Sequence, residues 1–302
     1  MMTVASLDRR ESARREYVAS AVITLFGVQV FSKGGVGNGN IRIEEIGPQQ
    51  GGTVAIEFAA GSRPEGAKGL NRLGYIHEAI LEDQPGQAAE CAYLAFMTAS
   101  DEKNVEQARK ALEAADNMQR YNAAQGFGRP GAFQSRIDRL AFSSKYSFRD
   151  LPALIPMART EMAAHAADPL DHQRDQETSH RATFLYMVRR ALLTPGKTST
   201  SHLFFNSKRY QLDTEKEFDA ATGAHFVQKK IVDSSSNVVR LSAWLTNEQT
   251  GHRTPFHVWY EKGQENQPPL RFDYQARSFL KLAFEALPKQ PNTGSMASAS
   301  LR

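Results

Sequence analysis

The feature that most constrains this chain is the alternation of apolar and polar residues between Ser201 and Ala286. In segments 270–275 and 280–285, every second position carries a large apolar side chain. Successive side chains of a strand point to opposite faces, so this pattern predicts strands with one dry face. Turn-forming residues divide the stretch into six short strands. The short loops favour antiparallel pairing, because parallel strands need long crossovers.

The N-terminal part of the chain has similar patterns. Residues 17–31 are uncharged, alternate, and are rich in Val, Ile and Thr, which indicates a strand pair bent at Gly27. Segments 41–46 and 53–58 also alternate. The glycine-rich residues 33–40 are expected to connect two strands, with positive φ angles at glycine. These strands could complete the C-terminal sheet or pack on it.

Helical periodicity is found in the middle of the chain. Apolar residues recur at spacings of three and four in residues 101–119, which predicts a helix with one buried stripe. Two further helices are predicted over 156–167, which begins at a proline, and over 181–193, which is followed by Thr-Pro-Gly. Residues 125–131 are expected to form a loop, and 136–148 a strand region.

Together these patterns predict an α+β protein, mainly antiparallel β. We expect a barrel-like or sandwich meander with about three helices between two β-rich ends. Residues 16–287 are predicted to form a single β-rich domain with a helical segment at 101–193. Residues 1–15 are predicted to be a flexible, charged leader, and residues 288–302 a disordered tail.

The charge of the chain gives little support to a nucleic-acid partner. Lys and Arg total 37, Asp and Glu total 33, and the net charge is +4. The basic residues are scattered among acids and are not interleaved with aromatic residues on one face. A hydrophobic content of 41% is ordinary for a soluble globular protein. The oligomeric state is left open.

Cysteine usage favours a reducing compartment. Cys91 is the only cysteine, so an intramolecular disulfide and a cysteine-based metal cage are both excluded. The uncharged run 17–31 is shorter than the roughly 20 residues of a membrane-spanning helix. A cytoplasmic location is therefore expected, although the basic residues before this run leave secretion open.

One glycine-rich motif resembles the start of a nucleotide site. Lys33–Gly37 resembles the beginning of the deviant phosphate loop of MinD-type ATPases. Asn38 stands where that loop has its phosphate-binding lysine, and Gly39 where it has the hydroxyl that binds Mg²⁺. A phosphate loop must also lead into a helix, whereas residues 41–44 have the alternation of a strand. An ATPase is therefore not predicted, and no cofactor is.

Two groups of residues have the side chains needed for catalysis or metal binding. His77 and Glu78 are the best acid–base candidates by residue type. A second group of histidines and carboxylates could supply nitrogen and oxygen ligands to a metal, but its spacing matches no known template. Its main candidates are His165, Asp168, His172 and His180.

Aromatic residues on one face of the C-terminal strands could line a ligand cavity, although a filled core is the commoner use of such residues. They are Phe256, Tyr260, Phe272, Tyr274 and Phe284.

Three classes of function are compatible with these features. The preferred one is non-enzymatic binding of a small, largely apolar ligand in the β-barrel-like body, because the sequence supplies an apolar interior and no catalytic signature. The second is a hydrolase or metal-assisted enzyme that uses the His and Glu residues above. The third is a structural or protein-interaction module with an exposed apolar patch or an open sheet edge.

Overall fold

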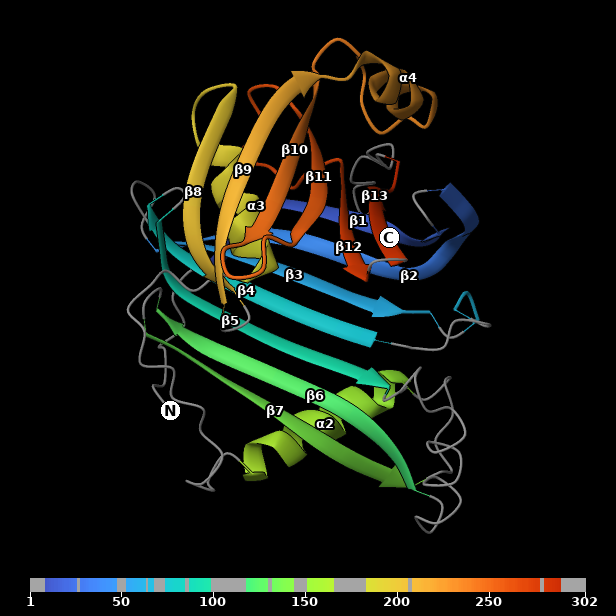
Figure 1. The fold of residues 1–302 in the computed structure, drawn as a ribbon, viewed down its shortest axis with the longest axis vertical. Coiled ribbons are helices and arrows are strands. Elements are labelled where there is room, and N and C mark those ends of the chain that lie inside the picture. The colour runs from blue at the N-terminus through green and yellow to red at the C-terminus, as the bar shows by residue number, and fades with distance from the viewer. Residues whose placement is uncertain are drawn as a thin grey trace, which may run out of the picture.

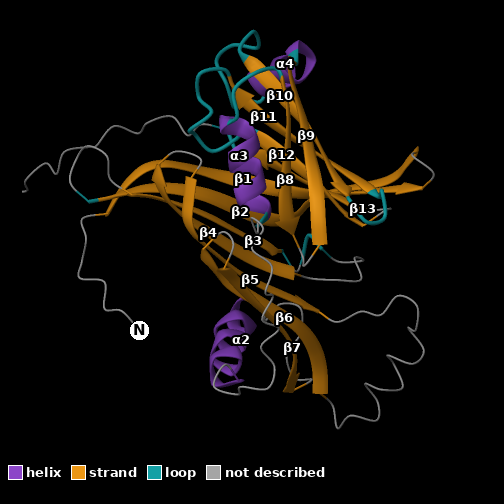
Figure 2. Ribbon diagram, turned by 60° about the vertical axis from the view of Figure 1, so that its left-hand side comes forward, coloured by secondary structure: helices purple, strands orange, loops and turns teal. Residues whose placement is uncertain are grey.

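The computed structural model describes residues 9–25, 28–47, 53–63, 65–67, 74–84, 87–98, 118–129, 132–143, 151–165, 183–205, 208–277 and 280–288. These residues contain thirteen strands and three helices (Figures 1 and 2). The N-terminal strands are β1 (Arg9–Leu25), β2 (Val28–Ile46), β3 (Thr53–Ser62), β4 (Gly74–Gln84), β5 (Gln87–Thr98), β6 (Met118–Arg129) and β7 (Ala132–Ser143). The C-terminal strands are β8 (Thr198–Phe205), β9 (Lys208–Phe218), β10 (Val238–Asn247), β11 (Arg253–Glu261), β12 (Arg271–Arg277) and β13 (Leu280–Ala286). The helices are α2 (Leu151–His165), α3 (Phe184–Leu193) and α4 (Ala220–Gln228).

All thirteen strands belong to one antiparallel sheet. Its order is β7-β6-β5-β4-β3-β2-β1-β13-β12-β11-β10-β9-β8, and all adjacent strands in this order are consecutive in sequence except β1 and β13. These two strands, the first and the last, pair from Tyr17 opposite Ala286 to Ile23 opposite Leu280. The two β-rich ends of the chain therefore share one sheet, with β7 and β8 as the edges of the described strands.

The sheet is strongly curved. Strands β3 and β12 are four places apart in the sheet, and neighbouring strands are about 4.8 Å apart, so a flat sheet would separate them by about 19 Å. The rings of Phe58 on β3 and Phe272 on β12 nevertheless lie with their centroids 5.4 Å apart. The C-terminal strands thus fold over the N-terminal ones, and the protein is barrel-like (Figure 1).

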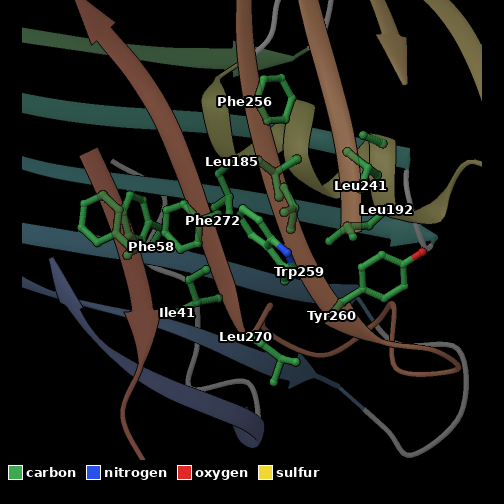
Figure 3. Close-up of a cluster of buried hydrophobic side chains, with 14 of the residues drawn as sticks. Ile41, Phe58, Leu185, Leu192, Leu241, Phe256, Trp259, Tyr260, Leu270 and Phe272 are labelled. Carbon is green, nitrogen blue, oxygen red and sulfur yellow. The ribbon is translucent and has the colours of Figure 1, made fainter. Parts of the chain in front are cut away.

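Helix α3 lies between the two parts of the curved sheet, in contact with β4 and β10 (Figures 1 and 2). Nearly all of its side chains are buried, as expected for a helix with sheet on more than one side. Figure 3 shows Leu185 and Leu192 of this helix among Leu241, Phe256 and Phe272 of the C-terminal strands. Burying one such side chain stabilises the fold by about 1.5–3 kcal/mol. The helix is therefore the central part of the core.

A second, smaller core lies under α2, which contacts β7. Leu154 and Ala158 of the helix pack there with Phe96 of β5 and with Leu140 and Phe142 of β7. The N-terminal sheet is thus covered by α3 near β4 and by α2 near its free edge.

The predicted fold class is confirmed: the protein is α+β and dominated by antiparallel strands. The predicted strand pair in residues 17–31 corresponds to β1 and β2. The predicted helices over 156–167 and 181–193 correspond to α2 and α3, and α2 begins earlier than predicted, so that Pro156 lies inside it.

Three expectations about segments are corrected. Strand β1 begins at Arg9, inside the segment 1–15 that was expected to be a flexible leader, because Arg9 to Arg15 pair with β2. The expected loop at 125–131 is mostly strand β6, because β5 and β7 flank it on both sides. The expected helical segment 101–193 thus includes the unexpected strand β6, whereas β7 corresponds to the predicted strand region 136–148.

Parts of two predictions lie outside the described residues. The predicted helix 101–119 lies there except for its last two residues, which begin β6. Of the predicted disordered tail 288–302, only Pro288 is described.

Helix α4 was not predicted. Its local signal is Asp219, whose carboxylate accepts a hydrogen bond from the backbone N–H of Thr222 at 2.9 Å and so caps the helix. The strand patterns on both sides obscured this signal. The third described helix therefore lies within the C-terminal β-rich end and not between the two ends.

The glycine-rich residues 33–40 form a bulge inside the single long strand β2, not a connection between strands. The pairing with β1 shifts between Ala19 and Ala21, and Gly35 has a φ of 67° within the shift. A Cβ atom on Gly37 would lie 2.6 Å from the carbonyl oxygen of Gly61. The glycines therefore serve close strand packing here, and no helix follows them.

Candidate ligand-binding clefts

Two clefts flank Tyr260 and are separated by the loop 262–269, which joins β11 to β12. The first, the α3 cleft, has a volume of about 440 Å³ and lies beside the C-terminal end of α3. The second, the Arg15 cleft, has a volume of about 360 Å³. The α3 cleft is lined by Leu192, Leu193, Thr194, Pro195, Gly196, Lys216, Glu217, Phe218, Val239, Tyr260, Lys262, Glu265 and Asn266. The Arg15 cleft is lined by Arg15, Tyr260, Glu261, Gln264, Gln267, Pro268 and Leu270.

The α3 cleft exposes a large aromatic side chain. Phe218, the last residue of β9, is 60% exposed. The ammonium group of Lys262 lies 5.3 Å from the centroid of its ring, a cation–π distance. Tyr260, Val239 and Leu192 supply apolar surface to the same cleft. The cleft therefore combines apolar walls with a cation at its rim.

Lys216 is a second cation in this cleft. Its Nζ donates hydrogen bonds to the carbonyl oxygens of Leu192 at 3.0 Å and Thr194 at 2.5 Å. These carbonyls end α3, where the helix dipole favours a positive charge. Burial lowers the pKa of Lys216 below its ordinary value. The side chain therefore holds the end of α3 against β9 beside the cleft.

Both acids of the α3 cleft already have partners. Glu217 forms an ion pair with Arg240, and the Oε1 atom of Glu265 accepts a hydrogen bond from the N–H of Gly263 at 3.1 Å. Arg240 therefore offsets the charge of Glu217.

A buried ion pair joins the clefts to the N-terminal sheet. The guanidinium of Arg189 on α3 lies 3.0 Å from the carboxylate of Glu82 on β4, and both side chains are almost fully buried. The same guanidinium donates a hydrogen bond to the carbonyl oxygen of Glu265 at 3.4 Å. Arg189 thus connects β4, α3 and the loop between the clefts.

The predicted acid–base pair is separated by the pleat of β4. Glu78 is buried and faces α3, where its carboxylate accepts a hydrogen bond from the backbone N–H of Leu185 at 2.7 Å. Burial raises the pKa of Glu78 to about 7, although the hydrogen bonds from the start of α3 oppose this shift. His77 is on the other face of the strand, with its Nε2 atom 3.7 Å from Glu57. The two side chains are therefore not brought together.

The predicted ligand-binding aromatics are divided between core and cleft. Phe256 and Tyr274 pack against Phe184 of α3, with ring centroids 5.5 and 4.9 Å away. Phe272 and Phe284 stack on each other at 4.9 Å. Tyr260 is the member of this set that lines the clefts.

The predicted metal ligands cannot be placed. Asp168, His172 and His180 lie outside the described residues, as does the side chain of His165. Among the residues that the structure describes, no group of three or more His, Cys, Asp or Glu side chains is arranged to hold a metal ion. Cys91 is buried, and burial raises the pKa of its thiol to about 12.

A polar row on the other face of the C-terminal strands was missed. Ser242, His257 and Asp273 lie directly opposite one another on β10, β11 and β12. The Nδ1 atom of His257 is 2.9 Å from Asp273, which also accepts a hydrogen bond from Lys281 at 2.8 Å. Neither cleft is lined by these residues, and no described hydrogen bond joins Ser242 to His257. His257, Asp273 and Lys281 therefore link β11, β12 and β13, and the period-2 pattern of polar residues was the only sequence signal for this row.

Comparison with known proteins identifies no family. No family model matches the chain, and no curated protein matches it. Among solved structures, a beta-barrel-like protein of domain of unknown function DUF1849 from Brucella abortus is similar, with a TM-score of 0.45 and 9% sequence identity. The similarity covers 93% of this chain and 96% of that one. Within the described residues, no helix has the length and hydropathy to cross a membrane.

Proposed function

We propose that the protein binds a small ligand with an apolar body and an anionic group in the α3 cleft. The observation that carries this proposal is the 60% exposure of Phe218 inside a cleft that also contains Lys262 and Tyr260. Exposed aromatic side chains in a concave site commonly mark ligand binding.

The size and chemistry of the cleft support this choice. A volume of about 440 Å³ is within the range of small-molecule sites. Leu192, Val239 and Phe218 could cover the apolar body of the ligand. Lys262 lies beside the ring of Phe218 and can attract an anionic group, and Arg240 offsets the charge of Glu217. The interior of the sheet is filled by α3, which favours this cleft over the barrel interior as the site.

The test uses a fluorescent acid, dansylaminoundecanoic acid, whose emission rises when it enters an apolar site. We expect saturable binding by the intact protein and displacement by decanoate but not by the neutral decanol at the same concentration. Phe218→Ala and Lys262→Gln should each weaken binding by about tenfold, which corresponds to about 1.4 kcal/mol.

The matched control is Phe31→Ala, since Phe31 is a second exposed phenylalanine, 45% exposed, on β2 and outside both clefts. The proposal is rejected if Phe31→Ala weakens binding as much as Phe218→Ala does, or if neither the probe nor decanoate binds saturably.

A further inference from the structure

We propose that the Arg15 cleft is a second, separate site, which binds the carboxylate group of a small polar molecule. This cleft lies on the other side of the loop 262–269 from the α3 cleft, and only Tyr260 lines both. The second site therefore does not depend on the ligand of the first.

Arg15 is an inward-facing cation. It lies two residues before Tyr17 on β1, so the two side chains share a face of the strand. Tyr17 is buried, and its hydroxyl donates a hydrogen bond to the carbonyl oxygen of Pro269 at 2.7 Å. Arg14 and Glu16 face the other way and form an ion pair with each other at 2.6 Å. Arg15 is therefore directed toward the loop that forms the cleft.

The guanidinium of Arg15 has unused hydrogen-bonding capacity. Its Nη1 atom is buried and has no hydrogen-bond partner within the described part of the chain. A buried donor without an acceptor is unfavourable. A small rotation of the Arg15 side chain would bring this N–H group to an acceptor in the cleft, and the new hydrogen bond would remove that cost. The fork of an arginine matches the two oxygens of a carboxylate.

The other walls of the Arg15 cleft favour a polar monoanion. Gln264 and Gln267 contribute neutral amide groups that can donate or accept hydrogen bonds. Burial raises the pKa of Tyr260 to about 12, so its hydroxyl stays protonated at neutral pH and can donate as well. Glu261 is the acid in the lining, and it disfavours a doubly charged group such as phosphate beside a single arginine. A carboxylate on a hydroxylated or amide-bearing body suits this surface.

The loop that carries these amides is held in place. The N–H of Gln264 donates to the carbonyl oxygen of Glu261 and the N–H of Gln267 to that of Gln264, both at 2.9 Å. Leu270 donates to the carbonyl oxygen of Trp259 at 2.7 Å, and Arg189 donates to Glu265. A site on a fixed loop loses less conformational entropy when it binds a ligand.

The test is a titration with lactate and with its neutral isostere lactamide, monitored by the backbone and side-chain amide signals of Gln264 and Gln267 in NMR spectra of the full chain. We expect saturable shifts with lactate at millimolar concentrations and at least tenfold weaker binding of lactamide. Arg15→Gln should weaken lactate binding at least tenfold. Arg14→Gln, on the opposite face of the same strand, should leave it unchanged.

Two further variants separate the possible outcomes. Arg15→Lys keeps the positive charge but loses the paired N–H groups of the guanidinium, so it should bind lactate with intermediate affinity. This variant serves as the test if Arg15→Gln does not fold. Phe218→Ala in the α3 cleft should have no effect, which distinguishes failure of this site from failure of the other. Equal binding of lactate and lactamide, equal losses in Arg14→Gln and Arg15→Gln, or the absence of saturable shifts would each overturn the proposal.

Discussion

The carboxylate of Glu78 on β4 accepts a hydrogen bond from the backbone amide of Leu185, at 2.7 Å, at the first turn of α3. One buried acid on the N-terminal part of the sheet thus orients the helix on which the C-terminal strands pack. One turn further along the same helix, the guanidinium of Arg189 pairs with the carboxylate of Glu82. The position of α3, and with it the wall of the α3 cleft, depends on these two contacts.

Glu78 should make the stability of the protein depend on pH. Burial raises its pKa in the folded protein to about 7 from an ordinary value of 4.5. The folded state therefore binds the proton more tightly than the unfolded state. The stability that this difference contributes is fully present below pH 4.5 and is lost as the pH rises to about 7. This difference corresponds to about 3 kcal/mol. Glu78→Gln should remove that part of the pH dependence when the free energy of unfolding in urea is measured at pH 5 and pH 8. The control is Glu90→Gln, because Glu90 is exposed, and this variant should keep the pH dependence of the parent protein. An unchanged pH dependence in Glu78→Gln would show that Glu78 does not cause it.

The Arg189–Glu82 pair should behave as a coupled unit. Arg189→Met leaves a buried carboxylate without its partner, which should lower the free energy of unfolding by about 3–5 kcal/mol. Glu82→Gln should also destabilise the protein. The double variant should lose less than the sum of the two, because neither charge then remains unpaired. A double-mutant cycle by urea unfolding measures this difference, and strict additivity would show that the two groups do not interact.

Asp273 should protect the protein against moderate acid. Burial raises the pKa of Asp273, but the hydrogen bond and charge of His257 and the charge of Lys281 outweigh burial, and the pKa lies below its ordinary value. A lowered pKa contributes stability above the ordinary value of 3.8, and this stability is lost as the pH falls below it. Asp273→Asn should therefore destabilise the protein by about 1–3 kcal/mol at pH 7 and flatten the loss of stability below pH 4. Circular dichroism during acid titration measures the effect, and an equally steep acid transition in the variant would count against it.

Phe272 should contribute much more to stability than Phe218, although both are phenylalanines on the C-terminal strands. Phe272 contacts Tyr17, Phe58, Phe184 and Phe284 inside the curved sheet. Phe272→Ala should cost about 3–5 kcal/mol, because it leaves a cavity among these rings. Phe218→Ala should change the melting temperature little, because its side chain is 60% exposed. Similar losses in thermal unfolding would mean that the curvature of the sheet is not held by this aromatic cluster.

The bulge in β2 should tolerate substitution at one glycine and not at another. A Cβ on Gly37 would lie 2.6 Å from the carbonyl oxygen of Gly61 on β3, whereas a Cβ on Gly34 would meet only the hydroxyl of Ser20, at 3.9 Å. Gly37→Ala should destabilise the protein by about 1–3 kcal/mol, because the backbone of a neighbouring strand must move. Gly34→Ala should be nearly neutral. Thermal unfolding of the two variants distinguishes them, and equal melting temperatures would show that the strands do not approach closely there.

The alternating residues of the C-terminal region were sufficient to predict most of its strands and their apolar face. Phe256, Phe272 and Phe284 do share that face, since Val258 lies opposite Phe272, and Phe272 lies opposite Phe284. The period of two is a local property of a strand, so it can be read from a few residues. Whether the face lines a cavity or fills a core depends on Phe184 of α3, which lies far away in the sequence.

The candidate clefts were less accessible to sequence reasoning. Tyr260 was expected among the ligand-binding residues and does line both clefts. Arg15 fell within the expected leader, and Phe218, Lys216 and Lys262 had no signal beyond an ordinary strand or turn. These residues gather only because the loop 262–269 lies between α3 and β1, where it accepts hydrogen bonds from Arg189 and Tyr17.

The sequence by itself determined the six C-terminal strands with their dry face, several of the N-terminal strands, and the positions of two helices, because these depend on neighbours a few residues apart. Only the tertiary structure decided that β1 pairs with β13, that the sheet curls around α3, and that Arg15, Lys216 and Lys262 line clefts beside Tyr260. Pairing between the two ends of the chain is selected by backbone hydrogen bonds and side-chain packing over hundreds of residues, and no local period encodes it.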